Sequence, residues 1–322
     1  MPDIGVVIPA YNSALYISQA VKSIQDQTHV HWRMVIVDDG SSDETGQIVQ
    51  TISDTDDRIK YIRQENQGVS AARNNGVEEL DTPWIYFLDA DDIAEPWALE
   101  ELLLTATEGG RHHAAHGLAT QFGDQEKTDY IDYLRDRRAL CGSEYRRLGP
   151  NEPTTFASLI RQNGITIGSI LIHKESFMRI GGFDANIKHC EDWNFFLRLS
   201  LSDDINFLDR SVLRYRRHES NASNNLDAMR LAERSLLKSM LQSPLLSPSQ
   251  KAVLHQRQRL DFIHRRDRIR KEFKLIFGSR RNLGIFRNKA DVMLAVMRQS
   301  AGLFRFWTQF PKSAIPRTWS KS

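Results

Sequence analysis

The chain has 322 residues, long enough to bury a sizeable core, and its 40% hydrophobic and 26% charged residues are typical of a globular protein. Two cysteines, Cys141 and Cys190, exclude a disulfide framework or a cysteine-rich zinc module. The net charge is only +2, and no basic, apolar leader or run of about 18 apolar residues is seen. We therefore expect a cytoplasmic protein without a signal peptide or a membrane-spanning helix.

The first hundred residues alternate between two patterns. Apolar runs predict strands at residues 4–8, 34–37, 58–63 and 84–88, the third of them at a sheet edge. Helical spacing of apolar residues predicts helices at residues 15–27, after Ser41 or Ser42 as the N-cap, and at residues 68–80. This alternation predicts an α/β, Rossmann-like fold, with a mainly parallel sheet covered by helices on both faces.

The second half is less regular. Residues 114–121 could form a strand, residues 124–153 are expected to be an exposed excursion, and His112, His113 and His116 are expected in a solvated loop. The patterns that follow predict strands at 168–173 and 207–217 and helices at 174–180, 191–201, 226–241, 248–277 and 289–307. We predict a catalytic domain at residues 1–225 and a C-terminal helical extension at residues 226–322.

Three carboxylates follow the fourth predicted strand within four positions: Asp89, Asp91 and Asp92. Like charges this close repel, so a cation is expected beside them. In an extended chain Asp89 and Asp91 face one side and Asp92 the other, and two oxygen ligands on one side suit Mg²⁺ or Mn²⁺. The alternative is a solvated acidic turn that caps a helix near Glu95.

Asn12, Asp39 and the acidic stretch all follow predicted parallel strands. Ligands of such sheets gather outside the carboxyl ends of the strands. The sequence therefore predicts that these three segments converge on one crevice.

Together these segments resemble glycosyltransferase family 2, whose members have the GT-A fold. The matching motifs, in order, are VIPAYN (7–12), VDDGSSD (37–43), NQGVSAARN (66–74), FLDADD (87–92), GGFD (181–184), EDW (191–193) and YRRH (215–218). The resemblance covers roughly residues 3–223, and residues 226–322 have no part in it. It implies an inverting, metal-dependent transferase of the hexosyl or N-acetylhexosaminyl type, acting in polysaccharide biosynthesis.

A carboxylate at Asp39 would accept a hydrogen bond from the imide N–H of uracil or thymine, which cytosine lacks, and we favour UDP over dTDP. The resemblance places the rest of the donor nucleotide at Pro9, Ala10, Tyr11, Asn12, Arg73, Asp89 and Ala90. Arg73 could equally form an ion pair with the acidic stretch. For the divalent metal, Mn²⁺ or Mg²⁺, the resemblance implies the DxD carboxylates Asp91 and Asp89 with His218, although Asn221 stands where the family pattern has serine.

Displacement at the anomeric carbon needs a deprotonated acceptor hydroxyl, and a carboxylate can serve as the general base. The resemblance favours Asp192 as this base over its neighbour Glu191, and the alternative is that both are a charge pair at the start of a helix. A helix N-terminus lowers the pKa of a carboxyl group and burial raises it, and the sequence leaves open which effect dominates.

The predicted function is transfer of a sugar from a nucleotide-sugar donor to a hydroxyl of a surface glycan or lipid-linked acceptor. The alternatives are a nucleotide-sugar-binding module without activity and a nucleotidyltransferase, although the latter would need a lysine-bearing phosphate loop after the first strand.

Residues 251–322 carry 18 Lys+Arg and 4 Asp+Glu, interleaved with aromatic residues. This pattern fits either a peripheral contact with the anionic cytoplasmic face of a membrane or packing against the catalytic domain or a second subunit of a homo-oligomer, and nucleic acid is not expected.

Overall fold

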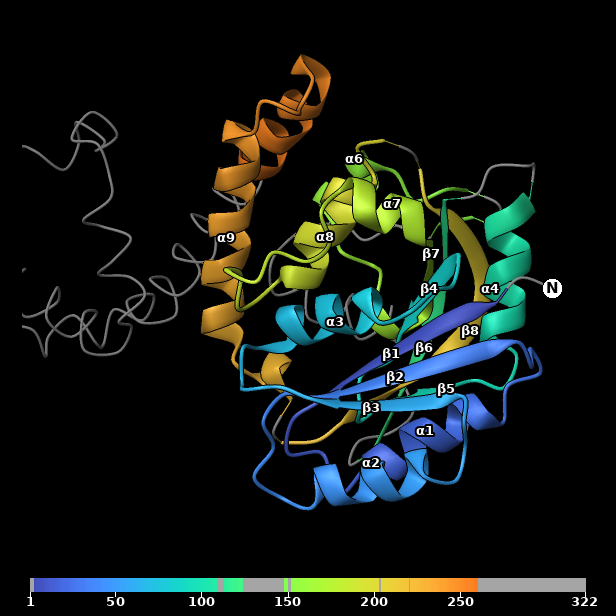
Figure 1. The fold of residues 1–322 in the computed structure, drawn as a ribbon. Coiled ribbons are helices and arrows are strands. Elements are labelled where there is room, and N and C mark those ends of the chain that lie inside the picture. Colours follow the sequence, from blue (N-terminus) through green and yellow to red (C-terminus); the bar gives the residue numbers. More distant parts are fainter. Residues whose placement is uncertain are drawn as a thin grey trace, which may run out of the picture. The chain divides into compact units, whose positions relative to one another are not determined.

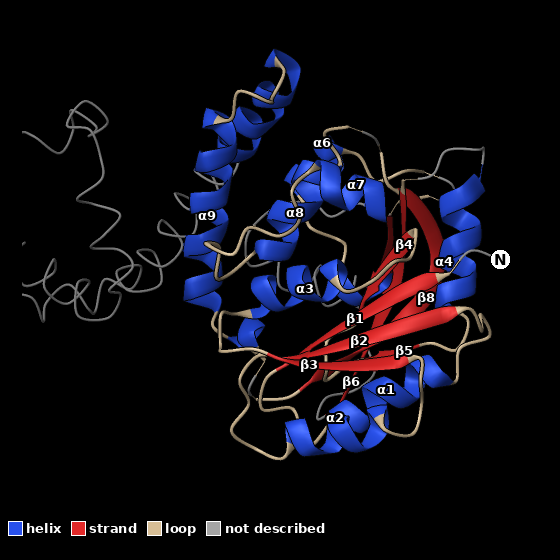
Figure 2. Ribbon diagram, in the orientation of Figure 1, coloured by secondary structure: helices blue, strands red, loops and turns tan. Residues whose placement is uncertain are grey.

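A computed structural model describes residues 3–108, 113–123, 148–149, 152–202, 204–219 and 221–259. Residues Met1–Gln258 form one compact unit, and the fold below is that of this unit. It consists of one eight-stranded sheet with helices on both faces, so the predicted α/β class is confirmed (Figures 1 and 2).

The sheet has the strand order β3-β2-β1-β4-β7-β6-β8-β5, with β3 at one edge as predicted. Its strands are β1 (Ile4–Ala10), β2 (Trp32–Asp38), β3 (Ile59–Arg63), β4 (Trp84–Phe87), β5 (Ile93–Ala94), β6 (Ala114–Gly123), β7 (Ile170–His173) and β8 (Asn206–Arg217). The first four strands are parallel, as are β6 and β8, whereas β7 and β5 run antiparallel to their neighbours.

The helices are α1 (Ile17–Gln25), α2 (Thr45–Ser53), α3 (Val69–Glu78), α4 (Ala98–Thr107), α6 (Phe156–Arg161), α7 (Lys174–Arg179), α8 (Glu191–Leu199) and α9 (Leu226–Gln242), with 3₁₀ turns η2 (Ile167–Ser169) and η3 (Ala222–Asn224). Where a helix range was predicted, the observed helix lies close to it, whereas α6 was not predicted. The predicted serine cap of α2 is wrong, because Glu44 is the N-cap residue. The Ser41 hydroxyl instead accepts the backbone N–H of Asn12 at 2.9 Å, which ties the loops after β1 and β2 together.

Side chains of the central strands alternate between two apolar cores. Val7 of β1 and Phe87 of β4 belong to the core beneath α3, α6, α7, α8 and α9. Ile8 of β1 and Tyr86 of β4 face the opposite core, beneath α1, α2 and α4. Because both faces of the sheet are buried, its strands read as continuous apolar runs in the sequence.

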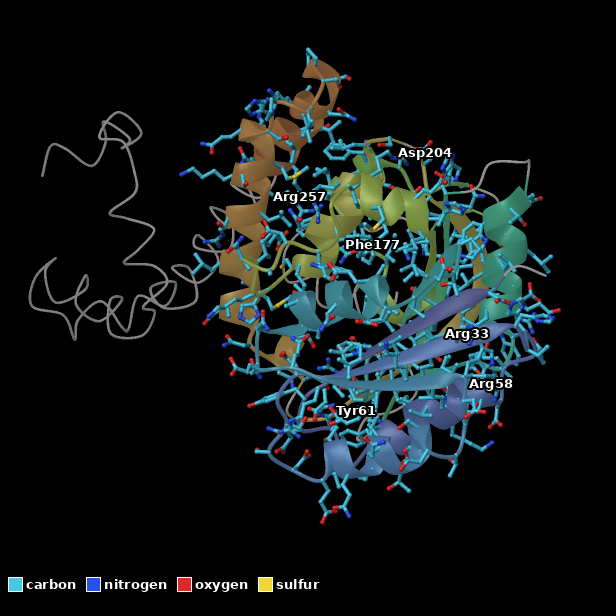
Figure 3. The ribbon with its side chains drawn as sticks, in the orientation of Figure 1. Arg33, Arg58, Tyr61, Phe177, Asp204 and Arg257 are labelled. Carbon is cyan, nitrogen blue, oxygen red and sulfur yellow. The ribbon has the colours of Figure 1, made fainter. Side chains whose placement is uncertain are left out.

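The helical region after residue 225 also packs on the first core. Leu237 of α9 and Leu254 are buried there. Arg257, labelled in Figure 3, is 6% exposed. Its guanidinium pairs with Glu233 at 2.7 Å and donates to the Arg161 carbonyl at the end of α6. A domain boundary at residue 225 stays a prediction, and the predicted helices beyond residue 259 lie outside the described residues. Within the described part, no helix is long and apolar enough to cross a membrane.

His116 corrects one expectation. It lies on β6 between two neighbouring strands, is 3% exposed, and its Nε2 is 2.6 Å from the Thr154 hydroxyl. Burial lowers the pKa of His116 to about 4. His116 is therefore a neutral core residue and does not belong to a solvated loop. His112 and most of the predicted excursion at 124–153 lie outside the described residues.

Candidate active site

The ends of β1, β2 and β4 bring the predicted site segments together. The Asp39 N–H donates to the Ala10 carbonyl at 2.8 Å, which joins the ends of β1 and β2. The Leu88 N–H donates to the Val7 carbonyl at 3.0 Å, one residue before the acidic stretch. Three segments far apart in the sequence thus meet at the carboxyl ends of the parallel strands.

The loop after β1 holds the predicted base-binding residues. Pro9 and Ala10 are buried within the strand, so the Tyr11 ring, 53% exposed, is the accessible part of this segment. Asn12 adopts the left-handed conformation, with φ at 48°, and its Oδ1 accepts the Ser42 N–H at 2.9 Å. Asn12 therefore connects the loops that follow β1 and β2.

Asp39 is 4% exposed and is already well bonded. One carboxylate oxygen accepts from Gln64 Nε2 at 2.7 Å and from the Gln67 N–H at 2.8 Å, and the other accepts the Gly68 N–H at 2.8 Å. A carboxylate has about four acceptor sites, so one remains for a ligand. These bonds also fix the start of α3, because Gly68 is its N-cap.

The acidic stretch is a turn, not an extension of β4. The Asp92 N–H donates to the Asp89 carbonyl at 3.0 Å across Ala90 and Asp91. The expectation that Asp92 faces away is therefore wrong, because the alternation of a strand ends at Phe87. One carboxylate oxygen from each of Asp89, Asp91 and Asp92 lies within 4.8 Å of the others.

His218 follows β8 and meets this turn, with 2.8 Å between its Nε2 and Asp91 Oδ2. Asn221, the residue in place of the family's serine, holds the histidine loop. Its Oδ1 accepts the His218 N–H at 2.7 Å, and its Nδ2 lies 3.5 Å from Asp91 Oδ2. The amide of Asn221 therefore contacts both the backbone of His218 and the carboxylate of Asp91.

The donor set of this cluster fits a small divalent cation. Burial raises the pKa of Asp91, and the neighbouring Asp89 charge raises it further. Burial raises the pKa of Asp92 as well, followed by the charges of Asp91 and Asp89. Two ligand atoms about 2.1 Å from one ion and at right angles lie about 3 Å apart, close to the distance of 2.8 Å between Asp91 and His218. A cation there would relieve the repulsion among the carboxylates.

Arg73 of α3 connects this cluster to the predicted base. Its guanidinium lies 2.8 Å from Asp89 Oδ1 and 3.3 Å from Glu191 Oε1, and the side chain is 3% exposed. The ion pair with the acidic stretch, one of the two predicted roles of Arg73, is thus present. Because Arg73 contacts both acids, it joins the acidic turn to the start of α8.

Asp192 lies in the first turn of α8, after Cys190 in the left-handed conformation. Its Oδ1 accepts the Trp193 N–H at 2.6 Å, and none of the ion pairs among the described residues involves it. Although part of the side chain reaches solvent, burial raises the pKa of Asp192 to about 7, and the Glu191 charge adds to this effect. Burial therefore dominates over the helix terminus.

The residues missed by the sequence reasoning support the turn. The Arg216 N–H donates to Asp92 Oδ1 at 2.8 Å, and its Nε donates to the Asp91 carbonyl at 2.7 Å. Tyr16 stacks on the His218 ring, with 5.1 Å between ring centroids. Arg216 belongs to a motif that the sequence already contained, whereas nothing in the sequence distinguished Tyr16.

The sequence pattern of the family described as Glycosyl transferase family 2 matches residues 5–177. An uncharacterized glycosyltransferase of Haemophilus influenzae is 30% identical over 198 residues, which cover 61% of this chain and 71% of the relative. The GalNAc(5)-diNAcBac-PP-undecaprenol beta-1,3-glucosyltransferase of Campylobacter jejuni is 36% identical over 129 residues, which cover 39% of this chain but only 42% of that enzyme.

Among solved structures, the fold is similar to residues 1–349 of S. aureus TarS in complex with UDP-GlcNAc. The TM-score is 0.60 at 19% identity, and the match covers 81% of this chain and 72% of that chain. At this identity the likeness concerns the fold.

Proposed function

Since the chain belongs to glycosyl transferase family 2 and has the predicted GT-A fold, we propose that it transfers a sugar from a UDP-sugar to an acceptor hydroxyl, with metal dependence and inversion at the anomeric carbon. The observation that carries this proposal is the pair of contacts made by Arg73, to Asp89 and to Glu191. These contacts join the acidic turn to the first turn of α8, which carries Asp192, and so support a metal site and a base close to each other, as a single displacement requires.

In this mechanism Asp192 takes the proton of the acceptor hydroxyl. The hydroxyl oxygen forms a bond to the anomeric carbon, while the bond to the diphosphate breaks and its electron pair leaves with the diphosphate. A pKa of about 7 suits a general base that works near neutral pH. Glu191 is a weaker candidate because Arg73 engages its carboxylate.

Asp91, His218 and Asp89 would hold Mn²⁺ or Mg²⁺, the cations that match carboxylate and imidazole ligands in this arrangement. The ion would stabilise the negative charge that develops on the leaving diphosphate. Asp39 would accept the imide N–H of uracil through its remaining acceptor site, with the exposed Tyr11 ring beside the base. A UDP donor is supported by the UDP-GlcNAc bound to TarS.

For the acceptor we propose a lipid-linked or surface glycan, with transfer of a hexose or an N-acetylhexosamine. The undecaprenol-linked glycan in the name of the Campylobacter relative supports this class of acceptor. We also propose that the protein acts at the cytoplasmic face of the membrane, where a lipid-linked acceptor and the basic C-terminal segment could meet the same surface.

The test is a panel of UDP-, dTDP-, GDP- and CDP-sugars, each incubated with the full chain and Mn²⁺ or Mg²⁺, with simple glycosides and polyprenyl-diphosphate glycans as acceptors. We expect metal-dependent release of UDP with an acceptor present, and inverted anomeric configuration by NMR. Retained configuration would refute the single displacement. Tight UDP-sugar binding without turnover across the panel would favour a binding module instead.

A further inference from the structure

The imidazole of His218 is held from two directions. Its Nε2 faces Asp91 Oδ2 at 2.8 Å, and one face of the ring stacks on Tyr16, with 5.1 Å between centroids and 28° between ring planes. We infer that Tyr16 is a positioning residue that orients His218 as a metal ligand. The inference rests on the metal site of the proposed function.

Tyr16 is itself well anchored. It is the residue before α1, and its N–H donates to the Ser13 carbonyl at 3.0 Å. The side chain is half-buried. Its ring contacts not only His218 but also Arg216, whose guanidinium carbon lies 4.8 Å from the ring centroid. A fixed ring therefore contacts two residues at the end of β8.

Both of those residues bind the acidic turn. Arg216 donates to the Asp91 carbonyl at 2.7 Å, and its Nη2 donates to Gln19 Oε1 on α1 at 2.7 Å. His218 contacts the Asp91 carboxylate. Tyr16 and Gln19 of the α1 segment thus hold the end of β8 against the turn that carries the proposed ligands.

His218 lies after the last residue of β8, and its Nε2 contacts Asp91 Oδ2 at 2.8 Å and Asn221 Nδ2 at 3.3 Å. The stack on Tyr16 matters because these contacts hold one edge of the imidazole, whereas the stack holds its face. Asn221 fixes the backbone of His218 through the bond to its N–H. Tyr16 restricts the plane of the imidazole, so that Nε2 points at Asp91. Groups that orient a metal ligand are typically worth about 10- to 100-fold in metal affinity.

The same loop carries the proposed base-binding residues. Tyr11 precedes Tyr16 by five positions, and Ser13, which accepts the Tyr16 N–H, donates its own N–H to Thr45 Oγ1 at 2.7 Å. A loop that contacts the nucleotide base would therefore also orient the metal ligand.

The experiment measures Mn²⁺ binding to the full chain in the presence of UDP, by electron paramagnetic resonance titration. Tyr16→Ala should weaken Mn²⁺ affinity about 10-fold, whereas Tyr16→Phe, which keeps the ring, should bind like wild type. Pulsed spectra of the bound ion should show the nitrogen coupling of a coordinated imidazole in wild type and Tyr16→Phe, and a weakened coupling in Tyr16→Ala. Thermal unfolding of each variant checks that the fold is retained.

A double-mutant cycle tests whether Tyr16 affects Mn²⁺ affinity through His218 or independently of it. If Tyr16 acts through His218, then Tyr16→Ala should have no further effect on Mn²⁺ affinity in a His218→Ala background. Equal affinity and unchanged nitrogen coupling in Tyr16→Ala would overturn the inference while leaving the metal site intact. Absence of Mn²⁺ binding by the wild type with UDP would overturn the proposed metal site, and the inference with it.

Discussion

The buried Arg73 forms an ion pair with the partly buried Asp89, with 2.8 Å between Nη2 and Oδ1. The same guanidinium also reaches Glu191, 118 positions away in the sequence, at 3.3 Å. One buried cation therefore neutralises an acid of the metal-type turn and an acid of the helix that carries the candidate base. This arrangement makes Arg73 important for stability as well as for any ligand it contacts.

We predict that Arg73→Met destabilises the protein by about 3 kcal/mol, because removal of one partner leaves two partly buried carboxylates without a cation. Urea unfolding measures the change. Lys60→Met is the matched control, since Lys60 and Glu79 form an exposed ion pair at 2.5 Å and its loss should cost less than about 1 kcal/mol. Similar small losses in both variants would contradict the role assigned to Arg73.

The second prediction concerns the metal. Asp91→Ala removes the carboxylate that faces His218, and it also removes a negative charge that, after burial, raises the pKa of Asp92. We expect the fold to persist and UDP binding to lose its dependence on Mn²⁺ or Mg²⁺. Calorimetric titration of UDP, with and without the ion, measures this directly. Equal UDP affinity in both conditions for the wild type would argue against a metal site in the acidic turn.

The third prediction concerns Asp192. Asp192→Asn keeps the shape but removes the proton acceptor, so transfer should fall by roughly 10²- to 10⁴-fold while donor affinity is nearly unchanged. In the wild type, kcat/KM should rise with pH up to about 7 and then level off, because the pKa of Asp192 is raised to about 7 and only the deprotonated form acts as a base. A profile that is flat from pH 5 to 8 would refute this assignment.

The raised pKa of Asp192 should increase activity with pH but decrease the stability of the fold with pH. Between its usual pKa of about 3.9 and the raised value of about 7, Asp192 keeps a proton in the folded protein that the unfolded chain has lost. This contribution to the free energy of unfolding therefore decreases as pH rises through that window. An asparagine side chain cannot titrate, so Asp192→Asn should not show this decrease. The free energy of unfolding of the variant, measured in urea and compared with that of the wild type, should therefore be relatively higher at pH 8 than at pH 5.

Strand and helix positions could be predicted because both faces of the sheet are buried. Apolar runs such as Ile4–Ile8 then mark the strands, and the polar residues that end them, Asp39 and Asp89, mark the crevice. The alternation of a strand predicted the wrong direction for Asp92. The backbone turns after Asp89, and this turn brings the Asp92 carboxylate close to those of Asp89 and Asp91. The pattern also gave no reason to expect His116 in the core, because its partner Thr154 is 38 positions away.

The site was predicted better as a set of residues than as a set of contacts. Asp89, Asp91 and His218 were named as metal ligands, and the structure brings them together around one turn. The direction of the Asp192 pKa shift depends on burial, which no local pattern shows. The contacts of Arg73 and Tyr16 are likewise made only by the tertiary fold.

A fourth prediction uses two adjacent glycines before α8. Gly181 and Gly182 both have positive φ, at 76° and 64°. A Cβ on Gly182 would lie 2.7 Å from Asn74 Oδ1, the atom that accepts the Phe183 N–H at 2.9 Å, whereas a Cβ on Gly181 meets nothing within 4 Å. Gly181→Ala should cost about 1–3 kcal/mol for its backbone conformation alone.

Gly182→Ala should cost more than Gly181→Ala, because it adds a clash that breaks the link between α3 and this loop. Urea unfolding of the two variants gives the difference. Equal losses would mean that Asn74 moves aside freely and does not hold the loop. Activity should fall with Gly182→Ala beyond the loss of folded protein, since Asn74 neighbours Arg73 on α3.

The last prediction concerns the basic C-terminal segment and where to cut it. Truncation at residue 250 would remove buried Leu254 and the Arg257–Glu233 ion pair, and would damage the first compact unit itself. Truncation after Arg259 avoids this and still removes 15 Lys+Arg and 4 Asp+Glu. This second variant therefore separates the charge of the segment from the packing of the fold.

We expect the full chain to co-sediment with anionic vesicles at low salt and with neutral vesicles much less. Each basic residue near an anionic leaflet contributes about 1 kcal/mol, and salt at physiological strength screens charges over about 8 Å, so binding should weaken as salt rises. The chain truncated after Arg259 should lose vesicle binding but keep UDP binding. If the segment instead forms a subunit interface, truncation should change the oligomeric state in sedimentation, and the full chain should show no preference for anionic lipid at any salt concentration.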